Sequence, residues 1–176
     1  VRIVDETGAI QEFEVALRGY HQEVVSFFWD NQTDDPELDW LEYGLPLMLT
    51  YDINRVSPVI TAITPLESDS LKGKLRDQGF DGLTDVPRGL AIEVSRDRRS
   101  AALVTGEFRV DGDARIISAS IIETASGELL GTRTASAKDW MSAVDQVTAA
   151  ILEFTEVTPA DNQSDDPLRQ HFSDSL

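Results

Sequence analysis

Residues 101–135, AALVTGEFRVDGDARIISASIIETASGELLGTRTA, contain the pattern that decides the fold. Asp111-Gly112 separates two strand-like runs, and this dipeptide suits a two-residue hairpin turn of the I′ type. With Val110 facing Asp113, the hairpin has one mostly polar face and one mostly apolar face, the latter carrying Ala102, Val104, Gly106, Phe108, Arg115, Ile117, Ala119 and Ile121. A second turn over 125–127 leads to a third strand over 128–134. The stretch therefore predicts an antiparallel meander whose apolar side is covered by helices.

The segments around the meander complete a mixed sheet. The apolar and aromatic run Glu23–Trp29 predicts a buried central strand, and the run 59–63, between two prolines, predicts another. Apolar spacing and capping residues predict helices over 45–55 with Pro46 at its start, over 66–78 closed by Gly79, from Asp85 to before Ser100, and over 139–154 capped by Ser136 or Asp139. The predicted fold class is α/β (α+β), with three to four helices on the sheet.

Composition excludes several classes of function. The chain has 176 residues, enough for one ordinary domain, no cysteine and a formal net charge of -17. Nucleic acid and anionic lipid surfaces would be repelled, so no nucleic-acid partner is expected. A basic cluster of Arg88, Arg96, Arg98 and Arg99 is either an anion patch or, as we prefer, a solvated helix end. The start at Val1 and the ending over 173–176 lead us to expect flanking modules.

Residues with catalytic potential are not gathered into a recognisable motif. His21 and His171 lie near opposite ends of the sequence, and neither a Gly-x-Ser-x-Gly turn nor a phosphate-binding loop is present. The acidic segment 30–41 begins like a calcium loop but has Asp35 and Leu41 where glycine and glutamate are needed. We therefore expect no catalytic residue, metal or cofactor, and predict that this fragment is not an enzyme.

The run WDNQTDDPELDWL, residues 29–41, followed by Gly44-Leu45, resembles the opening signature of the TolB amino-terminal-domain-like family. Residues 104–112 and 121–128 resemble its closing meander, and the resemblance spans about 24–154. Phe28 and Trp29 depart from the pattern, since they stand where the family commonly has proline and phenylalanine. Such domains occur between a cyclase, kinase or winged-helix output module and a tetratricopeptide-type array. The resemblance implies a sensory or protein-contact role in bacterial signal transduction, with a cyclase or kinase module elsewhere in the full-length protein.

Three segments are expected: an appended β-hairpin over 1–22, the TolB-like domain over 23–157, and an acidic linker with the start of a helical module over 158–176. Two functions stay open, namely contact with a protein partner or a second copy in a homodimer, and reception of a small ligand. Anchoring to a membrane through flanking sequence, with a periplasmic location, is preferred over a cytoplasmic one. The candidate interaction residues are Trp29, Asn31, Asp34, Asp35 and Trp40, an acidic loop framed by two aromatic side chains. The alternative is that both tryptophans brace this loop against the sheet, while Trp140 belongs to the core.

Overall fold

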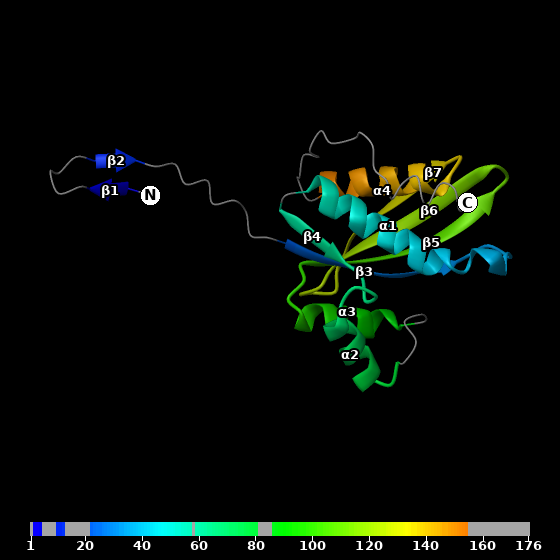
Figure 1. The fold of residues 1–176 in the computed structure, drawn as a ribbon, viewed down its shortest axis with the longest axis horizontal. Coiled ribbons are helices and arrows are strands. Elements are labelled where there is room, and N and C mark those ends of the chain that lie inside the picture. Colours follow the sequence, from blue (N-terminus) through cyan, green and yellow to red (C-terminus); the bar gives the residue numbers. More distant parts are fainter. Residues whose placement is uncertain (1, 5–9, 13–21, 58, 81–85, 155–176) are drawn as a thin grey trace.

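The computed structural model describes residues 2–4, 10–12, 22–57, 59–80 and 86–154, and a five-stranded mixed sheet organises them (Figure 1). The strand order is β4-β3-β5-β6-β7, with β3 parallel to both of its neighbours and the remaining pairs antiparallel. The strands are β3 (Gln22–Asn31), β4 (Ile60–Ile63), β5 (Ala102–Asp111), β6 (Ala114–Glu123) and β7 (Leu129–Ala137). The predicted fold class, the central position of β3 and the closing meander are confirmed.

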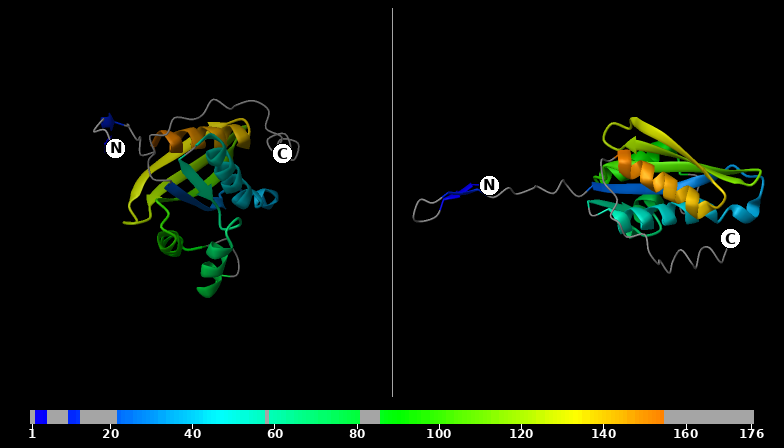
Figure 2. Two further views of the ribbon diagram at one scale, coloured as in Figure 1. Left: turned by 60° about the vertical axis from the view of Figure 1, so that its left-hand side comes forward. Right: turned by 90° about the horizontal axis from the view of Figure 1, so that it is seen from above.

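Helices lie on both faces of this sheet (Figures 1 and 2). They are α1 (Leu41–Val56), α2 (Asp69–Asp77), α3 (Arg88–Asp97) and α4 (Trp140–Phe154), and a short 3-10 helix, η1 (Pro36–Leu38), precedes α1. Figure 2 shows α1 and α4 on one side of the sheet and α2 and α3 on the other. The helices predicted over 45–55, 66–78 and 139–154 were expected on the apolar side, and for the second of them, α2, this is wrong. Its buried leucines, Leu71 and Leu75, join a cluster on the opposite face with Val25, Phe27 and Leu103.

The β5–β6 hairpin turns one position later than predicted. Asp111 pairs with Ala114 and Val110 pairs with Arg115, so the turn residues are Gly112 and Asp113. Only Gly112 of these two has a positive φ, 57°, which is the pattern of a type II′ turn with glycine first. The shift moves each partner by two residues, and because side chains alternate with period two, every residue keeps its predicted face. Phe108 and Ile117 are both buried, as the prediction required.

The main core lies between the sheet and the pair α1 and α4. Phe108 packs edge-to-face on Trp140, with ring centroids 5.5 Å apart, so Trp140 is a core residue. Asp139 accepts a hydrogen bond from the backbone N–H of Ser142 at 2.8 Å and is therefore the cap of α4 that the sequence offered. The buried members of this core from the two helices are Leu41, Leu45, Met48, Leu49, Ile53, Val56, Trp140, Ala143, Val144, Val147, Ile151 and Leu152.

Three helices, α1, α2 and α3, begin at other residues than predicted. Asp35 caps η1, which leads into α1 at Leu41, and Pro46 therefore lies inside α1 rather than at its start. The first turn of the helix is closed by the Gly44 N–H, which donates to the Trp40 carbonyl at 2.9 Å, and Pro46 follows in the next turn, where it donates no backbone hydrogen bond. The second helix begins after Ser68, whose hydroxyl accepts from the N–H of Leu71. It ends as predicted before Gly79, whose φ is 87°.

A bulge in β3 shapes the side of the sheet next to α1. Ser26 pairs with Val104 and Trp29 with Gly106, so β3 carries one residue more than β5 between these pairs. The indole of Trp29 lies over Gly106, which has no side chain to oppose it. Trp29 is thereby placed in the core at 1% exposure.

At the start of the chain, β1 (Arg2–Val4) and β2 (Ile10–Glu12) pair antiparallel as a separate two-stranded sheet. α3 begins at Arg88 with Pro87 as its N-cap, so the predicted cap Asp85 is wrong. The predicted linker over 158–176 lies outside the described residues. The domain boundaries therefore stay a prediction.

Candidate functional site

The predicted interaction loop between β3 and α1 is organised by the side chain of Asn31. Its Nδ2 donates to the Asp39 carboxylate at 2.7 Å and to the Asp35 carbonyl at 3.2 Å. Its Oδ1 accepts from the N–H and the hydroxyl of Thr33, at 2.8 and 2.6 Å. The side chain of Asn31 thus forms its hydrogen bonds within the loop and holds the loop in one conformation.

The five candidate interaction residues take three different places. Trp29 is buried, so its ring faces the core and not a partner. Asp34 and Asp35 are exposed on the loop, where the carboxylate of Asp35 accepts from the N–H of Glu37. Trp40 is 38% exposed and rests on Gly44, since a Cβ built there would lie 2.8 Å from its ring. The structure therefore places Asp34, Asp35 and Trp40, but not Trp29, where another molecule can reach them.

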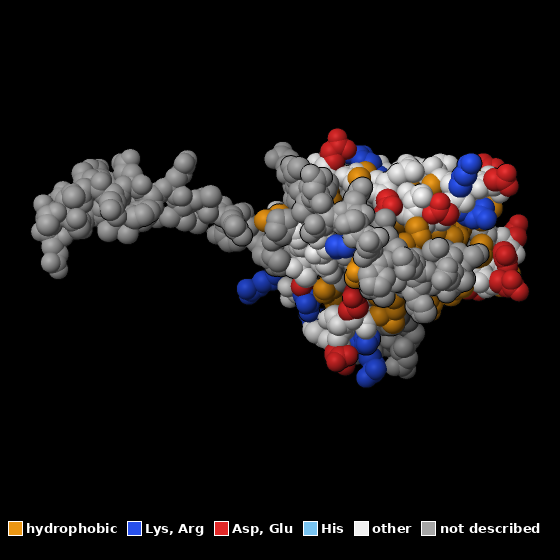
Figure 3. Space-filling view, turned by 45° about the horizontal axis from the view of Figure 1, so that its top comes forward, with side chains coloured by type: hydrophobic (Ala, Val, Ile, Leu, Met, Phe, Trp, Pro, Cys, Tyr) orange, Lys and Arg blue, Asp and Glu red, His pale blue; other side chains and the backbone are white. Residues whose placement is uncertain are grey.

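This loop lies at a strongly acidic end of the molecule. Figure 3 shows acidic side chains gathered at the end that carries the loop and the β5–β6 turn. A hollow of about 760 Å³ separates the two, between the loop, the exposed Val110 and the start of α4. Trp140 lines this hollow. The guanidinium of Arg115 lies over the Trp140 ring, 5.8 Å from its centroid. The exposed carboxylates at this end belong to Asp34, Asp35, Glu37, Asp39, Asp111 and Asp113.

One edge of the sheet is closed by a side chain. On β4, the Ala62 N–H donates to Asn54 Oδ1 and the Ala62 carbonyl accepts from Asn54 Nδ2, both at 2.7 Å. Ser57 Oγ accepts from the N–H of Ile60 at 2.9 Å on the same strand. The side chain of Asn54 thus takes the place that a neighbouring strand would occupy.

The opposite edge is open. β7 is the last strand in the order, and no strand of the described residues pairs with its outer side. Leu129 and Leu130 at its beginning are 48% and 39% exposed. Leu130 falls in a bulge, because β6 residues Ile121 and Ile122 pair with Gly131 and Leu129. An exposed edge strand with apolar side chains is a docking surface for another chain.

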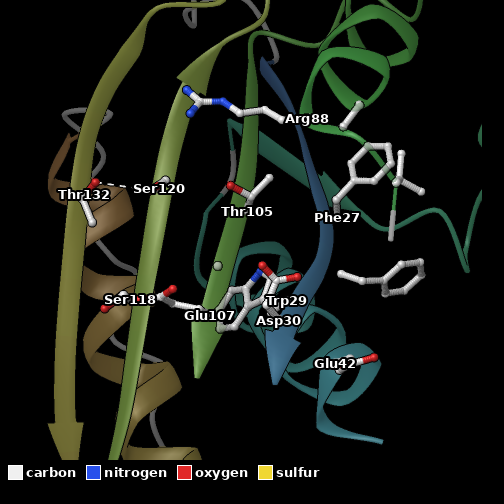
Figure 4. Close-up of a pocket in the computed structure, with 14 residues that line it drawn as sticks. Phe27, Trp29, Asp30, Glu42, Arg88, Thr105, Glu107, Ser118, Ser120 and Thr132 are labelled. Carbon is white, nitrogen blue, oxygen red and sulfur yellow. Dashed lines mark hydrogen bonds between the residues drawn. The ribbon is translucent and has the colours of Figure 1, made fainter. Parts of the chain in front are cut away.

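A cavity of about 470 Å³ lies beside the sheet at the start of α3 (Figure 4). Two pairs of hydroxyls stand on the sheet at or beside this cavity, Ser118 with Thr134 and Ser120 with Thr132, each 3.2 Å apart. Phe27 and Ala91 supply apolar wall, and Arg88 and Glu107 supply charge. No sequence motif indicated this cavity, because its walls come from separate segments of the chain, from Phe27 on β3 to Thr132 on β7.

The arginines of the predicted basic cluster lie at the two ends of α3 and make different contacts. Arg98 binds the Glu23 carboxylate through Nε at 2.6 Å and Nη2 at 2.8 Å, and Arg96 Nε donates to the Thr124 carbonyl at 2.8 Å. These two side chains hold α3 to the sheet. Arg88, at the other end of α3, lines the cavity.

The described residues contain neither a group of side chains that could hold a metal ion nor a helix that could cross a membrane. No group of three or more acidic or histidine side chains is gathered there in a way that could hold a metal ion. Likewise, none of the described helices has the length and apolar character needed to cross a membrane.

The fold has known counterparts, although no family model and no curated protein matches the sequence. The LpoB C-terminal domain from Escherichia coli superposes with a TM-score of 0.51 at 12% identity, covering 68% of this chain and 84% of that one. TolB from Acinetobacter baumannii gives a TM-score of 0.51 at 16% identity, covering 80% of this chain and 29% of that one. The chain has a TolB-like fold. At these identities the likeness concerns the fold alone.

Proposed function

We propose that this chain is a non-catalytic protein-interaction module of a bacterial signal-transduction protein, acting by contact with a partner or a second copy. The observation that carries the proposal is the contrast between the two sheet edges. Asn54 closes the β4 edge, whereas β7 is open and begins with the exposed Leu129 and Leu130. Within the five-stranded sheet, backbone pairing with another chain is therefore available at β7 and not at β4.

The sequence of β7 suits pairing with itself. Two antiparallel copies related by an axis between Leu130 and Gly131 place Glu128 of each copy opposite Arg133 of the other. Opposite charges on directly facing residues stabilise such a pair, and Leu129 then faces Thr132. The interface is the same patch on both copies, as a two-fold dimer requires.

The acidic loop supports contact of a second kind. Asp34, Asp35 and Trp40 present two carboxylates and one half-exposed aromatic ring on a loop that Asn31 holds rigid. A rigid, charged surface of this kind favours a basic protein partner and fast association. We assign these three residues to that contact.

Sedimentation velocity over a range of concentrations tests the β7 contact. A proline at Leu130 removes one backbone N–H from the start of β7, at a residue that has no direct register partner on β6. We expect the wild type to dimerise and Leu130→Pro to stay monomeric, whereas Leu130→Ala, which keeps the N–H, still dimerises. Equal dimerisation of wild type and Leu130→Pro would rule out backbone pairing at β7.

The dependence on salt concentration distinguishes dimerisation through β7 from the binding of a basic partner to the acidic loop. Two copies that each carry a charge of -17 repel one another, so screening strengthens a homodimer as salt rises. Binding of a basic partner to the loop weakens as salt rises, and Trp40→Ala weakens it further. A homodimer that dissociates at high salt would contradict the β7 model.

A second candidate function, reception of a small ligand, is favoured by one observation. The cavity of about 470 Å³ beside α3 combines an apolar wall from Phe27 and Ala91 with the charged side chains of Arg88 and Glu107.

A further inference from the structure

The outward side of α1 is apolar, in contrast to the other helices. A helix at the surface of a domain ordinarily presents polar side chains on the side turned away from the core. On α1 that side carries Trp40, Leu47 and Tyr51, which we call the α1 stripe. Trp40 and Tyr51 are 38% and 39% exposed, and Leu47 is half-buried. Among the described residues, α2, α3 and α4 expose no large apolar side chain.

The α1 stripe is continuous along the helix. Trp40, Gly44, Leu47 and Tyr51 follow one another at spacings of four, three and four residues, which places them in one line on a helix surface. At a rise of about 1.5 Å per residue, this line is about 16 Å long, or three turns. The side of α1 that faces the sheet is a different one, with Leu41, Leu45, Leu49 and Ile53 fully buried.

The ring of Trp40 is held against α1 by the absence of a side chain at Gly44. A Cβ built on Gly44 would lie 2.8 Å from Cζ3 of that ring, so the ring lies flat on the helix. Next to it, the ring of Tyr43 packs edge-to-face on Phe28, with centroids 4.7 Å apart. The aromatic surface at this end of the α1 stripe is therefore already ordered before another molecule arrives, which lowers the entropic cost of binding.

The charges at the two ends of the α1 stripe differ. The Trp40 end adjoins the acidic loop, where Asp34 and Glu37 are exposed. Near the Tyr51 end, the guanidinium of Arg55 lies 3.5 Å from the carboxylate of Asp52, so that these two charges offset one another. A molecule that covers the α1 stripe therefore meets uncompensated negative charge at one end, which favours a molecule with basic residues there.

The backbone of α1 restricts the structure of the molecule that can bind. Its N–H and C=O groups form hydrogen bonds within the helix, so an added strand has no backbone to pair with. A second helix presents apolar side chains at the same spacing and packs its ridges into the grooves of α1. A second copy of this chain suits the α1 stripe poorly, because it would bring another acidic loop and a further charge of -17.

We propose that the α1 stripe binds an amphipathic helix of a partner protein. The apolar side of this helix covers Trp40, Leu47 and Tyr51, and its lysine or arginine side chains meet Asp34 and Glu37. The inference rests on the proposed contact of a basic partner with the acidic loop, and it extends that contact along α1. It does not depend on pairing at β7.

A synthetic helix provides the test on the intact chain. The probe is a peptide of about 14 residues, two repeats of Leu-Lys-Lys-Leu-Leu-Lys-Leu, which spans the α1 stripe when helical. It should shift the indole signal of Trp40, identified by its loss in Trp40→Phe, in a saturable manner. A peptide of the same composition with leucines on all sides should bind about ten-fold more weakly, as should one with glutamate in place of lysine.

Substitutions in the α1 stripe should reduce the affinity for this peptide. Leu47→Ser and Tyr51→Ser should each weaken binding about ten-fold, because each removes apolar contact area. Ile92→Ser, at a half-buried position of α3 across the sheet, should have no effect. Gly44→Ala leaves every side chain of the α1 stripe in place but displaces the Trp40 ring, and should weaken binding about five-fold. Gly73→Ala in α2 is its matched control, since a Cβ there meets nothing within 4 Å.

The outcomes distinguish the α1 stripe from the acidic loop. Equal binding of the two leucine–lysine peptides, or a Leu47→Ser variant that binds as the wild type does, would overturn the inference. If Asp34→Asn and Glu37→Gln still weaken binding in that case, the proposed loop contact stands without the α1 stripe. A peptide that binds nowhere on the chain would contradict both. Dimerisation that Leu47→Ser abolishes, with no change in peptide binding, would assign the α1 stripe to a second copy instead.

Discussion

The indole ring of Trp29 lies so close over Gly106 that a Cβ built on this glycine would be 2.7 Å from ring atom Cδ2. Because the ring is buried, it cannot swing aside. We expect Gly106→Ala to lower the free energy of unfolding by about 1–3 kcal/mol, measured by urea denaturation. Gly73→Ala is the matched control, since a Cβ there meets nothing within 4 Å inside α2. It should raise stability by about 0.5–1 kcal/mol, because alanine is the better helix former.

The two-point contact between Arg98 and Glu23 joins α3 to the start of β3. Lysine cannot reproduce the forked geometry of a guanidinium, so we expect Arg98→Lys to lower the free energy of unfolding by about 1–2 kcal/mol. Arg99→Lys, at an exposed neighbouring position, should change it by less than about 0.5 kcal/mol. Equal effects of the two substitutions would show that the fork adds nothing to stability.

Asn54 both donates to and accepts from the backbone of Ala62. In Asn54→Asp the carboxylate can no longer donate, and its oxygen faces the Ala62 carbonyl. We expect a loss of about 1–3 kcal/mol on thermal unfolding. Asn54→Ala leaves both backbone groups to water at this exposed edge and should cost less than the aspartate. The opposite order would contradict the geometry described.

The sequence offered both Ser136 and Asp139 as the cap of α4, and the structure shows that Asp139 is the cap. Asp139→Ala should lower the free energy of unfolding by about 1 kcal/mol, because the Ser142 N–H loses its acceptor. Ser136→Ala lies on β7, exposed, and should be nearly neutral. Chemical denaturation of both variants checks this assignment.

The meander shows why much of the fold could be predicted from the sequence. The turn was misplaced by one residue, yet the partner of Phe108 moved by two positions and both faces stayed correct. The alternation of side chains between the two faces of a strand is thus easier to predict than the pairing register of two strands. Helix starts were less predictable: Pro46 suggested a start near Leu45, but the preceding turn at Asp35 carries the chain into α1 four residues earlier.

The candidate site was less predictable, because it depends on relations across the sheet. Trp29 precedes the acidic loop, and the sequence left open whether it contacts a partner or braces this loop. The bulge in β3 opposite Gly106 turns it inward. The cavity combines Asp30, Arg88 and Glu107, which three different elements bring together. Asn31 was predicted to be an interaction residue; its hydrogen bonds lie within the loop, and its part in any contact stays a prediction.

The side-chain closure at β4 limits what the domain can build. A sheet with two open edges can add copies at both, and such growth has no natural end, which is how strand-paired fibres elongate. With Asn54 occupying one edge, a copy joined through β7 presents no further free edge of the five-stranded sheet, so assembly by backbone pairing of this sheet stops at two. A single amide side chain thus separates a self-limiting assembly from an open-ended polymer.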